Sequence, residues 1–285
     1  MKTRIKIKTK TIYLIQIIFI SLFTILFYKF SYSYPSPYTS YKPRLNIPAK
    51  AWLILDSRNN KIIASKNANL KLAPASTTKI MTAYVIGKLI KQKKISLNTI
   101  VRISNKAAKT SGSRMNLISG RKVKIKTLLK GLLINSGNDA AVALAQGGAG
   151  SVNKFVSLMN KEAKSLGLKN THFSNPNGLP IKNHYSSAKD LAILANALIN
   201  KMPEIYKICS RKTIRWHKLK RKNTNKLLWS GLGVDGVKTG YTNKAKFCLV
   251  ASAVQKNHRI ITVLLGANTL KERDLQIMRR LSPMW

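Results

Sequence analysis

The chain has 285 residues, 45% of them hydrophobic, which is enough for one sizeable core in one or two domains. Its 52 Lys and Arg residues outnumber 8 Asp and Glu residues, for a formal net charge of +44. So few acids leave little material for a carboxylate-rich metal site or a glycosidase-type pair of carboxylates. No metal motif is visible around the 4 histidines, and we expect no metal or cofactor.

The positive charge is diffuse rather than gathered in a nucleic-acid-binding motif. Lysines occur along the whole chain, without zinc-finger spacing, a basic heptad region or a basic box interleaved with aromatic residues. Nucleic acid is therefore not the expected partner. A lysine-biased genome, or an anionic working surface such as a membrane or cell wall, explains the charge equally well.

The first 33 residues have the pattern of an export segment. Basic residues alternate along positions 2–10, residues 11–28 are uncharged and dominated by Ile, Leu and Phe, and Ser31-Tyr32-Ser33 offers small residues for cleavage. Because an uncharged run of 18 residues is near the length that spans a bilayer, residues 1–33 are either a signal peptide or an uncleaved membrane anchor. The basic flank predicts that the rest lies outside the cytoplasm, in the periplasm or on the outer face of the cytoplasmic membrane.

The remaining sequence predicts two sets of strands separated by helices. Residues 34–50 are rich in Pro, Ser and Tyr and are expected to form an extended linker. Strands are expected at 51–55 and 61–65, and helices near 77–89, 125–133, 140–146, 152–166 and 188–200. Strands return at 237–241, 247–254 and 260–265, before a last helix at 270–281. The prediction is an α+β fold at 51–285, in which both chain ends build one antiparallel sheet around an inserted helical lobe.

Three short motifs outline a serine nucleophile and its partners: Ser76-Thr77-Thr78-Lys79, Ser136-Gly137-Asn138 and Lys238-Thr239-Gly240. If Ser76 begins a helix, Lys79 lies on the same face and, when neutral, can take the hydroxyl proton as Ser76 attacks a carbonyl. Free lysine titrates near ~10.4, so the pKa of Lys79 must fall by roughly 3 units, which burial and the cation of Lys238 both favour. Lys238-Thr239 offers an ammonium and a hydroxyl to an anion, and Gly240 allows close approach.

Each motif is weak as a string. The chain has three further S-x-x-K strings, at Ser119, Ser151 and Ser186, and four further S-x-N strings, whereas K-T-G occurs once. No G-x-S-x-G elbow supports a Ser-His-Asp triad instead. The order of the three motifs and the residues that flank them therefore carry the argument.

The flanking residues resemble the active-site motifs of penicillin-interacting serine enzymes. The matching segments are 74–82, 135–141 and 235–242, with further matches at Gly112-Ser113-Arg114-Met115, 171–179 and 184–192. Among these enzymes, the chain is similar to the low-molecular-mass penicillin-binding proteins that are D-alanyl-D-alanine carboxypeptidases, from about residue 51 to the C-terminus. The resemblance implies a β-lactamase/transpeptidase-like fold.

The resemblance also implies a role for each matching residue. Ser76 would be the acyl-forming nucleophile and Lys79 its base, while Ser136 would relay a proton to the leaving D-alanine and Asn138 would hold the substrate amide. The terminal carboxylate would be bound by Lys238, Thr239 and Arg273; the alternative for Arg273 is a solvated residue of the last helix. The backbone N–H groups of Ser76 and Tyr241 would form the oxyanion hole, next to Gly240.

Several alternatives stay open. The expected partners are peptidoglycan stem peptides ending in D-Ala-D-Ala, with β-lactams as covalent inhibitors. A DD-endopeptidase that cuts cross-links, or a non-catalytic protein that binds cell wall and senses penicillin, would keep the same residues. Cys209 and Cys248 either pair in an oxidising compartment or remain two buried thiols.

Two departures from the family pattern shape these expectations. Many family members continue into a β-rich second domain and an amphipathic anchor, whereas this sequence ends at Trp285. Membrane association is therefore expected from residues 11–28 or from diffuse charge. Class A β-lactamases deacylate with a glutamate in an E-x-x-L-N context, which neither Glu162 nor Glu204 has, so we do not expect fast β-lactam hydrolysis.

Overall fold

The computed structural model describes residues 48–216, 219–255 and 257–281. The expected signal peptide or anchor at 1–33, and the expected linker up to residue 47, lie outside these ranges. No helix in the described ranges is both long enough and apolar enough to cross a bilayer. The predicted export segment and linker therefore stay predictions.

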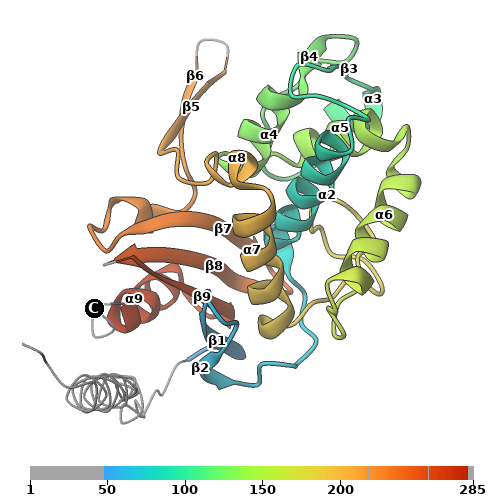
Figure 1. The fold of residues 1–285 in the computed structure, drawn as a ribbon. Helices are drawn as coiled ribbons and strands as arrows, with labels where there is room; N and C mark the ends of the chain where they lie inside the picture. Colours follow the sequence, from blue (N-terminus) through green and yellow to red (C-terminus); the bar gives the residue numbers. More distant parts are fainter. Residues whose placement is uncertain (1–47, 217–218, 256, 282–285) are drawn as a thin grey trace, which may run out of the picture. The chain divides into compact units, whose positions relative to one another are not determined.

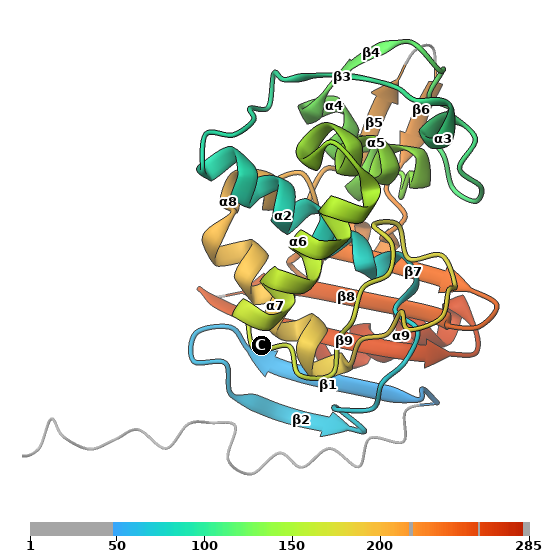
Figure 2. The ribbon, with the colours of Figure 1, turned by 90° about the vertical axis from the view of Figure 1, so that its right-hand side faces the viewer.

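One five-stranded antiparallel sheet forms the centre of the fold, with the strand order β2-β1-β9-β8-β7 (Figures 1 and 2). The strands are β1 (Ala51–Asp56), β2 (Ile62–Lys66), β7 (Val234–Thr242), β8 (Lys246–Gln255) and β9 (His258–Ala267). Strand β1 pairs with β9, so the two ends of the described chain meet inside the sheet. This confirms the predicted sheet built from both chain ends, and it leaves β7 as an edge strand.

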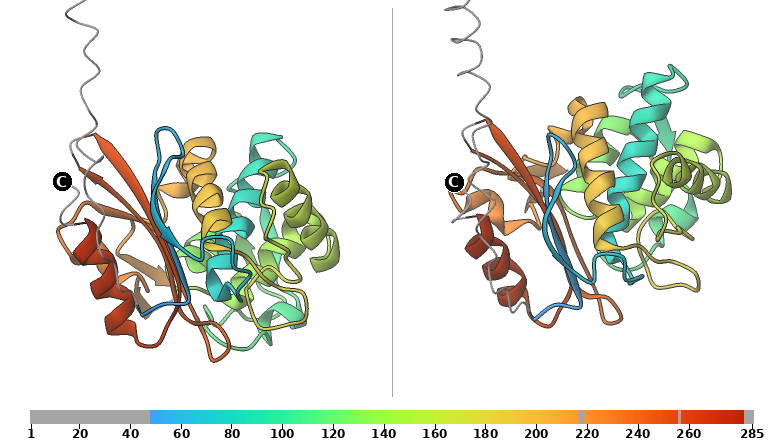
Figure 3. Two further views of the ribbon diagram at one scale, coloured as in Figure 1. Left: turned by 90° about the horizontal axis from the view of Figure 1, so that it is seen from below. Right: turned by 60° about the horizontal axis from the view of Figure 1, so that its bottom comes forward.

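Helices cover both faces of the sheet (Figure 3). On one face lie α2 (Lys79–Lys91), α4 (Ile125–Leu133), α5 (Asn138–Ala149), α6 (Val152–Ser165) and α7 (Ala188–Lys201), and on the other lies α9 (Leu270–Leu281). The side chains of β1 alternate between the two layers, as a strand requires: Leu53 packs in the larger core, and Trp52 packs in a smaller core that includes Ile277 of α9. The α+β fold with an inserted helical lobe is confirmed.

Short elements are the part of the fold that the sequence did not predict. They are β3 (Ile100–Arg102), α3 (Asn105–Ala108), β4 (Lys122–Lys124), α8 (Pro203–Tyr206), β5 (Thr213–Trp216) and β6 (Leu219–Lys222), together with the 3₁₀ turns η1 (Ala75–Thr78) and η2 (Lys226–Trp229). Each spans only three or four residues, which is too short for a hydrophobic period to be recognised. The β5–β6 hairpin projects away from the helices and the sheet (Figure 1).

The helix expected near residues 77–89 begins two residues later than expected, and Ser76 precedes it in a 3₁₀ turn. Ser76 lies in η1, and α2 begins at Lys79. Ala75, directly before Ser76, adopts a left-handed conformation with φ 48°, which an α-helix does not allow. Side chains three positions apart are nearly eclipsed in a 3₁₀ turn, so Ser76 and Lys79 still lie on one side.

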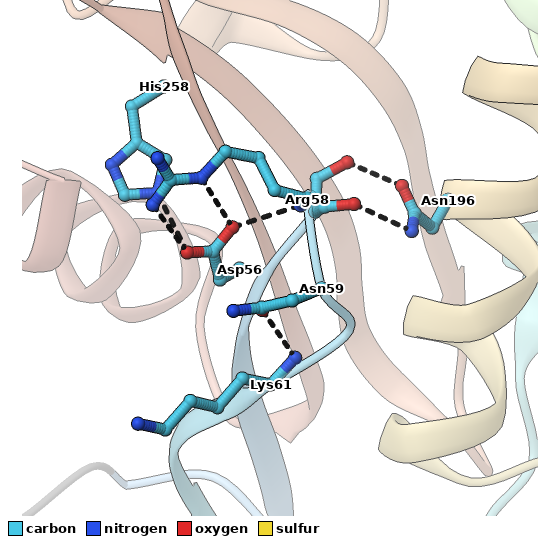
Figure 4. A network of polar contacts seen from close by, with 7 residues as sticks. Asp56, Arg58, Asn59, Lys61, Asn196 and His258 are labelled. Carbon is cyan, nitrogen blue, oxygen red and sulfur yellow. Dashed lines mark hydrogen bonds and ion pairs between the residues drawn. The ribbon is translucent and has the colours of Figure 1, made fainter. Parts of the chain in front are cut away.

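A polar network ties the β1–β2 turn to its neighbours (Figure 4). Asp56 accepts hydrogen bonds from the Arg58 backbone N–H at 2.9 Å and from Arg58 Nη2 at 3.0 Å, and His258 Nε2 lies 3.0 Å from its second oxygen. Asn196 of α7 donates to the Ser57 carbonyl at 3.1 Å. Burial alone would raise the pKa of Asp56, but the hydrogen bonds from Arg58 and His258 outweigh it and lower the pKa to about 2.

Replacing Asp56 with asparagine should therefore remove stability in a pH-dependent way. The folded-state pKa lies below the ordinary value of 3.8, so the carboxylate contributes fully above about pH 4, and its contribution disappears as the pH falls through about 2. We expect Asp56→Asn to lower the free energy of unfolding by about 2 kcal/mol near pH 7, and by less at about pH 3. Urea unfolding of both proteins at the two pH values measures this.

Glu204→Gln is the matched control, because the ion pair of Glu204 with Lys207 is solvated, with side chains 73% and 71% exposed. It should cost less than about 0.5 kcal/mol. An equal loss in both variants, or a loss for Asp56→Asn that does not change with pH, would contradict the assignment.

Candidate active site

A cleft of about 380 Å³ opens where the edge strand β7 meets η1 and the loop before α5. Six of the nine predicted site residues line it: Ser76, Ser136, Thr239, Gly240, Tyr241 and Arg273. The other three, Lys79, Asn138 and Lys238, lie buried directly beneath its surface. The fold thus brings together residues that are up to about 200 positions apart in the sequence.

The amine of Lys79 lies beside the hydroxyl of Ser76. Its Nζ is 2.7 Å from Ser76 Oγ, 2.7 Å from Asn138 Oδ1 and 2.7 Å from the carbonyl oxygen of Asn177. The two amide oxygens can only accept, so they take two N–H bonds of a neutral amine. The lone pair of that amine is then left for the hydroxyl proton of Ser76.

Burial favours the neutral form of Lys79. The residue is fully buried, and this burial is the main cause that brings the pKa of Lys79 well below 10.5. The cation of Lys238 lowers the pKa further, while the carboxylate of Asp139 acts in the opposite direction. Lys238 therefore acts as the sequence analysis expected, as a second cation that lowers the pKa of Lys79.

The loop before α5 supplies Ser136 and Asn138. Ser136 adopts a left-handed conformation with φ 60°, and Asn138 begins α5. The Asn138 amide donates to the Ser111 carbonyl at 2.7 Å, which fixes the oxygen toward Lys79. Asp139, completely buried, accepts from the backbone N–H groups of Met115 and Leu117 and so holds the loop that carries Ser113 against the cleft.

A second segment, residues 171–187, anchors the carbonyl of Asn177. The backbone N–H of Ser174 donates to His184 Nδ1 at 2.9 Å, so this nitrogen carries no proton and His184 Nε2 donates to Thr78 Oγ1 at 2.8 Å. Burial, aided by the electrostatic effect of the nearby His172, lowers the pKa of His184 to about 4, which keeps the ring neutral near pH 7. His184 thereby joins this segment to the turn that holds Ser76.

Strand β7 presents the cationic part of the cleft. Lys238 Nζ donates to the Thr239 carbonyl at 2.9 Å and lies 3.5 Å from Thr224 Oγ1, and the Thr239 hydroxyl donates to Thr224 Oγ1 at 2.7 Å. Burial lowers the pKa of Lys238 from 10.5 to about 7; Cys209 opposes this shift and the cation of Arg273 adds to it. An anion bound here would raise the pKa of Lys238 and favour its charged form.

Gly240 lets β7 approach the nucleophile. A Cβ at this position would lie 3.0 Å from the Ser76 backbone nitrogen and 3.1 Å from the Ala75 Cβ. The backbones of Ser76 and of the strand that continues into Tyr241 therefore run in contact. This is the arrangement that an oxyanion hole made from their N–H groups requires.

Arg273 belongs to the cleft and not to the solvent. It is 2% exposed, lines the cleft from α9, and its Nε donates to Asp274 Oδ1 at 2.8 Å. The alternative of a solvated residue on the last helix is wrong, because the side chain is almost fully buried. A guanidinium held in this way offers its remaining N–H groups to a bound anion.

Three groups of the site were missed by sequence reasoning. They are the Thr224 hydroxyl, the Asn177 carbonyl and the Asp139 carboxylate. A backbone carbonyl leaves no pattern in the sequence. Thr224 lies in a basic segment, outside the three motifs, so nothing in the sequence singles it out. Asp139, directly after Ser136-Gly137-Asn138 and one of only 8 acids, is the one that the sequence could have indicated.

The two candidate glutamates and the two cysteines do not line the cleft. Glu162 pairs with Lys88 at 3.3 Å and Glu204 with Lys207 at 2.8 Å, and neither lines the cleft. Cys209 and Cys248 are two buried, unpaired thiols. Across the residues that the structure describes, no three His, Cys, Asp or Glu side chains gather closely enough to hold a metal ion.

Comparison with known proteins places this arrangement in a family. The sequence model of the peptidase S11 family, described as D-alanyl-D-alanine carboxypeptidase, matches residues 37–269. D-alanyl-D-alanine carboxypeptidase DacF of Bacillus subtilis is 45% identical over 242 residues, which are 82% of this chain and 61% of that protein. The chain thus spans about three fifths of the length of the first curated relatives that it matches.

Solved structures agree. The structure of penicillin binding protein 5 from Haemophilus influenzae has a TM-score of 0.82 and 40% identity, covering 84% of this chain and 71% of that one. Penicillin-binding protein D2 of Listeria monocytogenes, solved with bound ampicillin, has a TM-score of 0.77 and 29% identity over 84% of this chain and 98% of that one. With a family model that matches most of its length, this chain belongs to the D-alanyl-D-alanine carboxypeptidase family, peptidase S11.

Proposed function

We propose that this protein is a serine-type D-Ala-D-Ala carboxypeptidase that removes the terminal D-alanine from peptidoglycan stem peptides. The observation that carries the proposal is the 2.7 Å contact between Lys79 Nζ and Ser76 Oγ, with two acceptors that occupy the N–H bonds of the amine. Membership of the family supports the same substrate class, and the ampicillin complex of the related Listeria protein supports β-lactams as covalent inhibitors.

In the acylation step, Ser76 Oγ attacks the carbonyl carbon of the scissile peptide as its proton passes to Lys79 Nζ. The oxyanion that forms is stabilised by the backbone N–H groups of Ser76 and Tyr241. The C–N bond then breaks, and the proton moves through the Ser136 hydroxyl to the nitrogen of the leaving D-alanine. Asn138 orients the substrate amide, and Lys238, Thr239 and Arg273 bind the terminal carboxylate.

In the deacylation step, water attacks the ester of Ser76. Lys79 takes the proton of the water, the ester C–O bond breaks, and Ser76 regains a proton. A β-lactam enters the same acylation step, but its opened ring stays attached to the acyl group. The distance of both Glu162 and Glu204 from the cleft supports slow release of that adduct.

We also propose a setting for the reaction. Residues 51–285 form the penicillin-binding catalytic domain, and residues 34–50 link it to a signal peptide or membrane anchor at 1–33. The reaction then takes place outside the cytoplasm, in the periplasm or on the outer face of the cytoplasmic membrane, with residues 11–28 as the source of any membrane association.

The deciding experiment is an assay for free D-alanine with purified protein and a pentapeptide ending in D-Ala-D-Ala. We expect continuous release that a penicillin blocks, and no release by the Ser76→Ala variant. Stable labelling by a fluorescent penicillin without any D-alanine release would favour the non-catalytic, penicillin-sensing alternative. Strong labelling of Ser76→Ala would overturn the choice of nucleophile.

A further inference from the structure

A second pocket adjoins the proposed catalytic cleft. It measures about 310 Å³ and is lined by Lys222, Asn223, Lys226 and Trp229, at the base of the β5–β6 hairpin. Lys226 also lines the catalytic cleft, so the two hollows share a wall. None of the functions proposed above uses this pocket.

The pocket lies on the side of the cleft that is formed by Lys238 and Thr239. Thr224, two positions before Lys226, contacts Thr239 Oγ1 at 2.7 Å and Lys238 Nζ at 3.5 Å. These are the groups assigned to the carboxylate of the leaving D-alanine. The pocket therefore adjoins the leaving-group end of the substrate and not the end that becomes the acyl group.

Within the described residues, no acidic side chain forms an ion pair with the lysines that line this pocket. From Arg211 to Lys226 the chain carries eight Lys and Arg residues and no Asp or Glu. All 8 acidic side chains are engaged elsewhere: with arginine (Asp56, Asp235, Asp274), with lysine (Glu162, Glu204), or with backbone N–H groups and hydroxyls (Asp139, Asp190, Glu272). A ligand with negative charge fits this environment.

The walls of the pocket are partly rigid and partly apolar. Asn223 is 5% exposed, and its amide donates to the carbonyls of Cys209 and Arg211, so it fixes the base of the hairpin. Trp229 is 44% exposed, with Lys212 Nζ 5.8 Å from its ring centroid. The indole face can cover the aliphatic part of a ligand while Lys222 and Lys226 meet its charge.

We propose that this cationic pocket binds a carboxylate on a leaving group larger than D-alanine, namely the amine component of a peptidoglycan cross-link. The inference rests on the proposed function. Free D-alanine ends at the carboxylate held by Lys238 and Thr239 and has no atoms left to reach the pocket. In a cross-link, the scissile nitrogen belongs to a neighbouring stem peptide, which continues past that carboxylate and carries further carboxylates.

The chemistry of cutting such a cross-link is the same acyl transfer. Ser76 Oγ bonds to the D-alanyl carbonyl carbon, the C–N bond to the neighbouring peptide breaks, and that nitrogen receives the proton. Water then hydrolyses the ester. The pocket thus extends the substrate class from D-Ala-D-Ala peptides to cross-linked dimers, which corresponds to DD-endopeptidase activity.

Binding to the Ser76→Ala protein tests the pocket without depending on turnover. Two cross-linked dimers serve as probes, one with free carboxylates on the amine component and one in which the carboxylates beyond the scissile junction are amidated. We expect the free acid to bind about fivefold more tightly or better, and Lys222→Gln to remove most of that difference. The matched control is Lys61→Gln, an exposed lysine on the β1–β2 turn at the other edge of the sheet (Figure 4).

The outcomes separate the two proposals. Equal affinity for both dimers, or equal losses in Lys222→Gln and Lys61→Gln, would overturn the pocket assignment whether or not the unmodified chain releases D-alanine. Absence of D-alanine release with a retained, Lys222-dependent preference would overturn the carboxypeptidase proposal alone. If Lys222→Gln weakens binding of a teichoic-acid-type polyphosphate but leaves the dimer preference intact, the pocket serves that polymer and the inference is wrong.

Discussion

Replacing Lys79 with glutamine should slow acylation by a fluorescent penicillin about 10³-fold, because it removes the proton acceptor for Ser76. The side chain is fully buried and lies 2.7 Å from Ser76 Oγ, so no solvent group can take its place. Stopped-flow or timed labelling measures the rate, and a thermal unfolding curve shows that the variant is folded. A rate within tenfold of the unmodified protein would mean that Lys79 is not the base.

The charge of Lys238 should lower the pH at which Lys79 becomes active. The base works when neutral, so acylation should rise with pH as Lys79 loses its proton. Removing the cation in Lys238→Gln raises the pKa of Lys79, so the rising limb of the profile should move to higher pH, in addition to any loss of rate. Lys91→Gln, at the exposed end of α2, is the control and should change neither the rate nor the limb.

If acylation by Lys238→Gln rises over the same pH range as acylation by the unmodified protein, the proposed effect of Lys238 on the pKa of Lys79 is contradicted. That result would mean that burial alone sets the pKa of Lys79. Burial is the larger cause, so the expected displacement is upward in pH while the pKa stays below its ordinary value. The position of the limb, rather than the height of the profile, is therefore the quantity to compare.

The sequence predicted well what depends on long patterns. The continuous apolar run of β1, the helical period after Ser76 and the strand of Lys238 all rest on several residues that give the same signal, and the structure has each of them. The three motifs also meet at one cleft, since strand order and helix position bring the chain ends together. The assignment of roles to these residues stays a proposal.

What escaped prediction depends on single residues and on backbone conformation. Ala75 and Ser136 adopt left-handed conformations with φ 48° and 60°, although alanine and serine rarely do so. The sequence carries no sign of this, because the surrounding structure imposes it. Thr224 and the Asn177 carbonyl likewise become part of the site only through contacts across more than ten residues of chain.

Gly178 is the glycine at which adding a side chain should most disturb both the stability and the active site. It adopts φ +87°, and a Cβ there would lie 1.9 Å from the carbonyl oxygen of Ala75 and 3.0 Å from the Ser76 nitrogen. Its neighbour Asn177 supplies the carbonyl that holds Lys79 Nζ at 2.7 Å. We expect Gly178→Ala to lower the free energy of unfolding by about 3 kcal/mol and acylation about 10²-fold, since the nucleophile and its base must both shift.

Gly167→Ala separates the two causes in this prediction. Gly167 also has a left-handed conformation, with φ +70°, but nothing lies within 4 Å of its virtual Cβ. Its substitution measures the conformational cost alone, about 1 kcal/mol, and should leave acylation unchanged. If both variants lose the same stability and neither loses acylation, the packing of Gly178 against Ala75 does not position the nucleophile. The difference between the variants thus measures how strongly the segment 171–187 holds Ser76 and Lys79 together.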